Sequence, residues 1–264
     1  MDELRIMSYN VRYDTPEDGK DAWPHRRDAT ASVVRFHEPD LVGFQEPDPH
    51  QVEDLRERLS EYRIVGVGRD DGEEGGEFGP IGYRIERFEL LESETFWLSE
   101  TPERPGSVGW DAAMPRIVTW ARLRDRTNGS ELFHFNTHLS YHGERARRES
   151  ARILRDRVTD RDGDVPAIVT GDFNCVAGSR PHTTLAGDGS PLRDTMAAAD
   201  APHHGPETSF TDFSDLIPDR LIDHVLVTEG TEVRRHGVLA DLDERGRFPS
   251  DHLPVLAIVD VPGH

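Results

Sequence analysis

The sequence feature that most constrains the fold is an apolar run that stops at a glycine, a carboxylate and an amide. Residues 165–174 read VPAIVTGDFN. The β-branched side chains are typical of a buried strand, and Gly171 allows a sharp turn at its end. Asp172 and Asn174 lie two positions apart, so they would share one face if the chain stayed extended. A simple turn uses the same residue types, so this stretch alone fits either a turn or a functional site.

Polar residues also stand at the ends of other expected strands. Hydrophobic patterning predicts strands at residues 4–11, 41–46, 117–123, 132–139 and 222–227, and a last strand that ends near residue 259. Helical spacing predicts helices at residues 24–37, 49–59 and 143–158, and a short one at 191–198. The polar residues at or beside the strand ends are Asn10, Glu46, Arg116, His138, Asp223 and the adjacent pair Asp251 and His252.

Three further segments complete the expected organisation. Residues 66–79 are rich in Gly, Asp and Glu and predict an exposed loop that ends near Glu77. Residues 80–84 and 88–91 are expected to pair as a hairpin. The irregular stretches 99–115 and 200–218 are long enough to be functional loops. Within the second, His203 and His204 are expected to be solvated rather than ligands.

Length and composition favour a single domain. A chain of 264 residues with 35% apolar residues can bury one core, so we expect one domain over residues 1–264. No apolar run approaches the ~18 residues of a membrane span, and no signal peptide is evident. The single cysteine excludes an internal disulfide and a cysteine-based zinc site. We therefore expect a cytoplasmic monomer without membrane contact.

The charge is strongly acidic. The formal net charge is −20, and of the 31 basic residues only Lys20 is a lysine. Such a surface repels polyanions at long range, which disfavours, without excluding, a nucleic-acid partner. The composition suggests a halophilic protein from a salt-rich cell, with an ordinary acidic cytosolic protein as the alternative.

The strand-end residues together suit one kind of chemistry. Carboxylate and amide oxygens are the ligands that Mg²⁺ prefers, and imidazoles transfer protons near neutral pH. The sequence contains no His-Glu-x-x-His zinc motif and no phosphate-binding Gly-x-x-x-x-Gly-Lys motif. This set indicates metal-assisted hydrolysis of a phosphoester.

Six short motifs, in order, resemble the endonuclease/exonuclease/phosphatase superfamily, whose fold is like that of deoxyribonuclease I. They are SYNV at residues 8–11, QE at 45–46, NTHL at 136–139, GDFN at 171–174, IDH at 222–224 and SDHLPV at 250–255. Segments 95–102, 109–113 and 115–116 further resemble a prokaryotic single-domain branch. The resemblance implies an α/β (α+β) fold, a four-layer α/β sandwich with two face-to-face mixed β-sheets flanked by helices.

The resemblance also implies a role for each site residue. Glu46 would be the principal ligand of Mg²⁺ or Mn²⁺, assisted by Asn10 and Asp251. His252 would be the general base oriented by Asp223, while Asp172 and Asn174 position the water and a phosphate oxygen. His138 would contact or protonate the phosphate, with Glu77 as its orienting carboxylate, and Arg116 would grip a non-bridging oxygen.

Three functions remain open at this point. A phosphatase or phosphodiesterase acting on a small or lipid-derived phosphoester and a nuclease acting on DNA or RNA would use the same residues. A catalytically inactive binding module is less favoured, because such a protein normally loses its acid or base and none of the matched positions is lost here.

Overall fold

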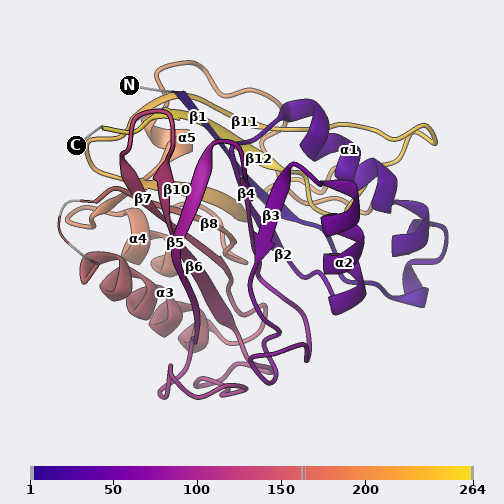
Figure 1. The fold of residues 1–264 in the computed structure, drawn as a ribbon. Helices are drawn as coiled ribbons and strands as arrows, with labels where there is room; N and C mark the ends of the chain where they lie inside the picture. Colours follow the sequence, from indigo (N-terminus) through magenta and orange to yellow (C-terminus); the bar gives the residue numbers. More distant parts are fainter. Residues whose placement is uncertain (1–2, 162, 164, 263–264) are drawn as a thin grey trace.

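The computed structural model describes residues 3–161, 163 and 165–262 (Figure 1). The first half contains β1 (Glu3–Asn10), the 3-10 helices η1 (Pro16–Asp21) and η2 (Trp23–His25), α1 (Arg27–His37), β2 (Leu41–Gln45), α2 (Pro49–Arg58), β3 (Tyr62–Val65), β4 (Ile81–Arg84), β5 (Phe88–Trp97) and β6 (Ile117–Asp125). The second half contains β7 (Glu131–His138), α3 (Glu144–Thr159), β8 (Ala167–Asp172), α4 (Arg180–Ala186), β9 (Leu192–Asp194), α5 (Thr195–Ala198), β10 (Asp223–Thr228), β11 (Glu232–Val238) and β12 (Val255–Asp260).

The strands form two mixed sheets of six strands each. The first has the order β11-β12-β1-β2-β4-β3 and the second the order β5-β6-β7-β8-β10-β9. The pairs β1–β2 and β7–β8 are parallel, and the other described pairs are antiparallel. The sheets lie face to face, with α1 and α2 packed outside the first and α3 and α4 outside the second (Figure 1). This arrangement confirms the predicted four-layer sandwich.

The alternation of side chains along each strand divides the apolar residues among three interfaces. In β1, Leu4 and Ile6 lie in the core between the sheets, while Met7 and Tyr9 lie in the core beneath α1 and α2. This two-residue period is the geometry of a strand covered on both faces. A third cluster fills the space between the second sheet and α3.

The inner faces of the central strands become polar toward one end. Along β1, Leu4 and Ile6 are followed on the same face by Ser8 and Asn10. The inner faces of β7 and β8 change in the same way, and they end at His138 and Asp172. Because β1 and β8 belong to different sheets, the two faces bring their polar ends together between the sheets.

Several local predictions were wrong. Residues 80–84 and 88–91 do not form a hairpin, because β4 pairs with β2 and β3 while β5 pairs with β6 in the other sheet. The chain therefore crosses between sheets after Arg84. The helix predicted at 191–198 begins as strand β9 and is helical only over Thr195–Ala198. The short elements β3, β11 and α4 were not predicted.

Candidate active site

The predicted residues converge on one pocket of about 420 Å³. Within residues 3–161, 163 and 165–262, none of the helices combines the length and the hydropathy of a membrane span. The predicted residues that line the pocket are Glu46, Glu77, Arg116, His138, Asp172, Asn174, Asp251 and His252. Asn10 and Asp223 lie directly behind these, in hydrogen bonds to Glu46 and His252.

His252 and Asp223 form the pair that the sequence predicted. Nδ1 of His252 lies 2.8 Å from Oδ2 of Asp223, and both residues are buried. The same Asp223 oxygen accepts a hydrogen bond of 2.6 Å from Ser209. Burial opposes a charge on the imidazole, but the carboxylates of Asp223 and Asp172 raise the pKa of His252 well above its ordinary value.

Glu46 is held in place from two strands. It follows β2 with a φ of 73°, a left-handed conformation that is uncommon outside glycine and clusters at functional sites. Its two carboxylate oxygens accept hydrogen bonds from Nδ2 of Asn10 at 2.9 Å and from the backbone of Tyr13 at 3.2 Å. Burial opposes ionisation, but His252 and Asn10 lower the pKa of Glu46, so the side chain is a carboxylate.

Asn10 presents its amide nitrogen, not its oxygen, to the carboxylates. Nδ2 donates to Glu46 and, at 3.1 Å, to Asp172, while Oδ1 accepts from the backbone of Arg12 at 2.9 Å. In this arrangement Asn10 joins two carboxylates through its amide nitrogen. Its role as a metal ligand stays a prediction.

Asp172 is central to the site. Its carboxylate lies 3.3 Å from Nε2 of His138 and 3.7 Å from Nε2 of His252. Burial, and then the charge of Asp223, raise the pKa of Asp172 to about 7. The chain does not stay extended after it, because Asn174 has a φ of 49° and its backbone N–H donates to Asp172. The stretch is therefore both a turn and part of the pocket.

His138 is fixed by Asn174 and not by Glu77. Nδ2 of Asn174 lies 2.9 Å from Nε2 of His138 and also donates to the carbonyl of Leu139. Glu77 instead bonds to Arg69 at 2.6 Å, so the predicted pairing with His138 is absent. Burial, and then Arg116, lower the pKa of His138 well below its ordinary value. A neutral imidazole can donate a hydrogen bond to phosphate, but it is a poor source of a proton.

Arg116 lies in the pocket wall immediately before β6. Its side chain is buried, and among the described residues it makes no hydrogen bond and no ion pair within 4.0 Å. Burial lowers the pKa of this guanidinium, because the charge has lost its water without gaining a close anion. An anionic ligand in the pocket would supply that anion.

Several residues that line the pocket were not predicted from the sequence. Arg12 bonds to Asp18 and lies 3.6 Å from Asp251. It follows the SYNV motif directly, and this adjacency was the available signal. Phe210 packs edge-on against His252, with ring centroids 5.0 Å apart. The guanidinium of Arg220 lies over the Phe210 ring. Phe210 lies in the stretch 200–218, which the sequence predicts to be a functional loop, and Arg220 lies two residues beyond that stretch.

The residues present fit a hard divalent cation. Single ligand atoms of Glu46, His138 and Asp172 lie within 4.8 Å of one another. Burial also raises the pKa of Asp251, so this carboxylate, like that of Asp172, would gain from a nearby positive charge. Oxygen-rich donor sets without thiolate suit Mg²⁺ or Mn²⁺.

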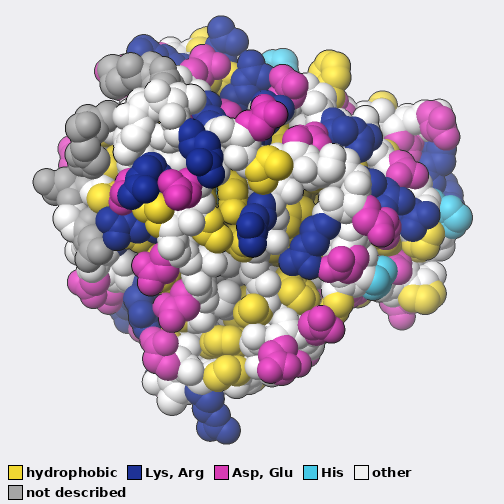
Figure 2. Space-filling view, in the orientation of Figure 1, with side chains coloured by type: hydrophobic (Ala, Val, Ile, Leu, Met, Phe, Trp, Pro, Cys, Tyr) yellow, Lys and Arg dark blue, Asp and Glu magenta, His cyan; other side chains and the backbone are white. Residues whose placement is uncertain are grey.

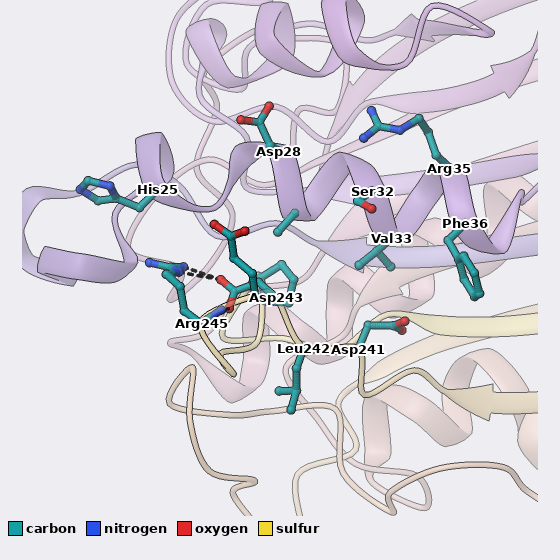
Figure 3. Close-up of a pocket in the computed structure, with 13 residues that line it drawn as sticks. His25, Asp28, Ser32, Val33, Arg35, Phe36, Asp241, Leu242, Asp243 and Arg245 are labelled. Carbon is teal, nitrogen blue, oxygen red and sulfur yellow. Dashed lines mark hydrogen bonds and ion pairs between the residues drawn. The ribbon is translucent and has the colours of Figure 1, made fainter.

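A larger hollow of about 600 Å³ lies elsewhere, between α1 and residues 241–245 (Figure 3). Its lining includes the ion pair of Arg245 with Asp243 and the exposed side chains of Phe36 and Leu242. None of the predicted site residues lines it. Size alone therefore does not identify the active site, whereas the convergence of carboxylates and imidazoles does.

Comparison with known proteins agrees with this geometry. The sequence profile of the Endonuclease/Exonuclease/phosphatase family matches residues 7–252. A solved endonuclease/exonuclease/phosphatase from Bacteroides vulgatus is 37% identical, with 99% of this chain and 100% of that chain covered and a TM-score of 0.94. A mannosyl-6-phosphatase from Bacteroides thetaiotaomicron VPI-5482 is 36% identical, with 98% and 100% covered and a TM-score of 0.92. An uncharacterized protein of Acanthamoeba polyphaga mimivirus is 26% identical over 282 residues, which cover 97% of this chain and 100% of that protein.

Proposed function

Because the chain belongs to the endonuclease/exonuclease/phosphatase family, we propose that it is a divalent-metal-dependent phosphatase that hydrolyses a compact phosphomonoester. Members of this family are generally hydrolytic phosphoesterases. The observation that carries the proposal is the His252–Asp223 pair beside the carboxylates of Glu46 and Asp172 in one pocket. A base and a cluster of metal-binding oxygens in contact are what attack of water on phosphorus requires.

The bound phosphate would be held by groups that now lack partners. Arg116 would donate to a non-bridging oxygen and would thereby have an anion within hydrogen-bond distance. Nδ1 of His138, which has no hydrogen-bond partner among the described residues, would donate to a second oxygen. Both groups would hold the phosphate between Glu46 and His252. Positioning of this kind contributes much of the rate of phosphoryl transfer.

Water activation would fall to His252. Asp223 fixes the ring so that Nε2 faces the pocket, and this nitrogen would take the proton from the attacking water. Glu46 and Asp251 would hold the cation, with Asp172 beside them. When bound, the cation would neutralise charge on the phosphate oxygens and oppose the raised pKa of His252. Deprotonated His252 could then act as the base.

The substrate class is inferred from size and charge. A pocket of about 420 Å³ accommodates a small molecule, and the chain carries a net charge of −20, which disfavours a long polyanion. The similarity to a mannosyl-6-phosphatase at 36% identity over nearly the whole chain favours a sugar phosphate. A nuclease remains the second candidate, because the family includes endonucleases and exonucleases.

The test is an assay of phosphomonoesters, phosphodiesters, single strands and duplexes with Mg²⁺ and with Mn²⁺. We expect sugar phosphates to be hydrolysed fastest and chelation to abolish the activity. Glu46→Gln should lower turnover by at least ~10²-fold while the protein stays folded. Glu53→Gln is the matched control, because Glu53 is an exposed residue of α2 paired with Arg56. Full activity in excess chelator, or in Glu46→Gln, would refute the metal assignment.

A further inference from the structure

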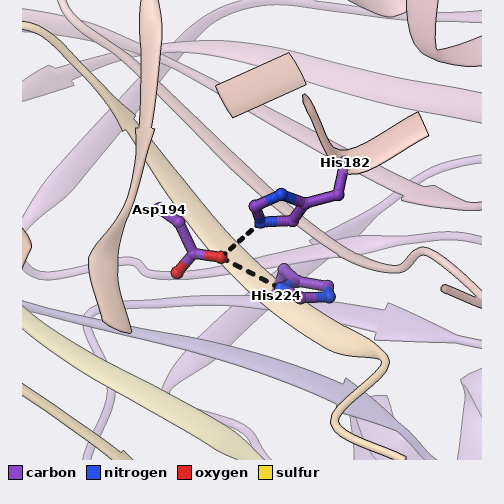
Figure 4. Close-up of side chains that lie close together, drawn as sticks. All are labelled: His182, Asp194 and His224. Atoms are coloured by element: carbon purple, nitrogen blue, oxygen red, sulfur yellow. Dashed lines mark hydrogen bonds and ion pairs between the residues drawn. The ribbon is translucent and has the colours of Figure 1, made fainter. Parts of the chain in front are cut away.

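A second buried group of titratable residues lies outside the pocket. It consists of His182 from α4, Asp194 at the end of β9 and His224 in β10, each no more than 7% exposed. Nε2 of His182 and Nδ1 of His224 lie 2.7 Å and 3.1 Å from the same oxygen, Oδ2, of Asp194. Figure 4 shows both imidazole rings directed at this carboxylate.

The contacts of His224 fix its protonation. Its Nδ1 faces the Asp194 carboxylate, and its Nε2 lies 3.0 Å from the backbone carbonyl of Cys175. A carbonyl oxygen only accepts hydrogen bonds, and an ionised carboxylate does likewise. Both ring nitrogens of His224 must therefore carry a proton, which makes the ring an imidazolium.

The other two members complete this assignment. The backbone N–H of Gly178 donates to Nδ1 of His182 at 3.3 Å, so Nε2 carries the proton of a neutral ring. Asp194 accepts these two ring N–H groups and, through Oδ1, the N–H of Met196 at 2.8 Å. Burial opposes its ionisation, but the bonds from His182 and His224 lower the pKa of Asp194. Three donors stabilise a carboxylate, not a carboxylic acid.

These protonation states leave no free ligand nitrogen for a metal at the cluster. Three ligand atoms of these residues lie close enough for one ion, but a ligand nitrogen needs a free lone pair. The nitrogens of His182 and His224 that face Asp194 both carry protons. Nδ1 of His182, which would have to take over the proton, already accepts one from Gly178.

His224 contacts the catalytic turn from the side away from the pocket. In the β8–β10 ladder, Asp223 pairs with Asp172 and His224 pairs with Gly171. The ring of His224 stacks on Phe173, with centroids 5.1 Å apart and planes at 26°. Its Nε2 lies within hydrogen-bond distance of the backbone carbonyl of Cys175. The ring therefore contacts the turn at two residues, Phe173 and Cys175.

We infer that His224 is a positioning residue for the proposed hydrolysis, a buried imidazolium held by Asp194 that braces the 172–175 turn. The inference rests on the proposed function for its kinetic consequence only. Asp172 and Asn174 set the position of His138, so slack in the turn would misplace groups that must meet the phosphate. Errors of about 1 Å at such sites can cost ~10²-fold in rate.

Nuclear magnetic resonance of the whole ¹⁵N-labelled protein tests the protonation directly. We expect a proton on both ring nitrogens of His224 at neutral pH, with signals identified by their loss in His224→Gln. One unprotonated nitrogen would overturn the inference. So would stoichiometric zinc, retained after incubation with zinc sulfate and desalting, that is lost in both His224→Gln and His182→Gln. Neither result depends on enzymatic activity.

The brace is tested with two matched variants. Glutamine has a donor atom and an acceptor atom, as neutral His182 does, but it carries no charge and cannot donate from two separate atoms as His224 does. In His224→Gln we expect the Asn174 amide to exchange with solvent about tenfold faster or more, while His182→Gln stays near the parent. Equal exchange in the two variants would overturn the brace even if no phosphoester were hydrolysed.

Kinetics then connect the brace to the reaction. With a sugar phosphate as substrate, His224→Gln should lower kcat by about tenfold or more and change KM by less than about threefold. His182→Gln should retain most of kcat. A fall in kcat of the same size in both variants would show that the cluster acts only through general stability. If exchange changes as expected while no substrate is turned over, the proposed function fails and the brace stands.

Discussion

His252 hydrogen-bonds to a carboxylate that also accepts from Ser209, so the orientation of its ring is determined on one side. If Nε2 takes the proton from water, His252→Ala should lower kcat by ~10²-fold or more. Asp223→Asn should do similar damage, because it removes the partner that fixes the ring. Steady-state kinetics with a phosphomonoester would measure both. The control is His50→Ala, since His50 pairs with Asp14 on the surface. Loss of affinity with retained turnover would mean that His252 only holds substrate.

His134 makes the stability of the protein depend on pH. It is fully buried in β7, its Nε2 lies 2.9 Å from Oγ1 of Thr170, and burial lowers its pKa to about 3. The unfolded chain binds this proton near pH 6.5 and the folded chain only near pH 3. The free energy of unfolding should therefore fall as the pH falls through this window, by at most about 1.4 kcal/mol per pH unit from this group.

The variant His134→Gln keeps a polar partner for Thr170 and removes the titration. Urea denaturation between pH 6.5 and pH 4 should show a shallower loss of stability than in the parent. His25→Gln, at an exposed position, should leave the slope unchanged. Identical slopes in the parent and in His134→Gln would contradict the assignment.

Site residues were predictable where the chain places them at strand ends. Asn10 and Glu46 lie at the ends of β1 and β2 in one sheet, and His138 and Asp172 lie at the ends of β7 and β8 in the other. The four residues meet because these ends of the two sheets face each other. Partners within an irregular loop were not predictable. Glu77 bonds to Arg69, eight residues away, across its own loop, and no periodicity in the sequence distinguishes that partner from His138.

At the scale of elements, a layer of buried polar side chains lies beneath the site. Nε2 of Gln45 donates to Oδ1 of Asn136 at 2.7 Å, and Oγ1 of Thr170 donates to the same oxygen at 2.9 Å. Nδ2 of Asn136 donates to the carbonyl of Phe44 at 2.6 Å. These bonds join β2 of one sheet to β7 and β8 of the other. Because Glu46, His138 and Asp172 come one or two residues later, the layer sets how the two sheets present them.

Gly43 shows how closely the two sheets approach within this layer. A Cβ at this position would overlap Oγ1 of Thr170 and Oδ1 of Asn136. Gly43→Ala should therefore lower the free energy of unfolding by about 1–3 kcal/mol and reduce turnover. Denaturant titration and kcat measure the two effects. Gly79→Ala is the control, since its Cβ would have no neighbour closer than 3.9 Å. Equal stability of the two variants would show that the layer can shift at little cost.

Elements with a strong period were predictable, and short elements were not. The helix predicted at 143–158 is α3 over Glu144–Thr159, and the strand predicted at 222–227 is β10 over Asp223–Thr228. β3 and β9 have four and three residues, which is too few for a period to appear. The predicted pairing of β4 with β5 was wrong. A short connection favours a hairpin, but here the two strands belong to different sheets.

At the scale of the whole molecule, many basic side chains lie beside acidic ones instead of forming a basic surface. On the face shown in Figure 2, Lys and Arg side chains lie among Asp and Glu side chains without a continuous basic stripe. Many arginines are ion-paired, as Arg58 is with Asp54 and Arg87 is with Asp40. A protein that tracks a duplex needs several unpaired cations aligned with phosphates. The described surface on this face does not offer them.

The net charge of −20 leads to a prediction about salt. Mutual repulsion among acidic groups is screened at high ionic strength, where the Debye length falls to about 3 Å at 1 M salt. A small phosphomonoester that depends on Arg116 and a bound cation inside a pocket should lose little from this screening. We therefore expect turnover of a sugar phosphate to persist or rise between 0.1 M and molar salt. Binding of a long duplex through many phosphates would instead weaken steeply as salt rises.

The measurement is kcat/KM for a small phosphoester and for a long duplex across one salt series. Processive cleavage of the duplex at low salt that collapses at high salt would contradict the proposed phosphatase, because a steep fall of this kind is what many contacts to duplex phosphates produce.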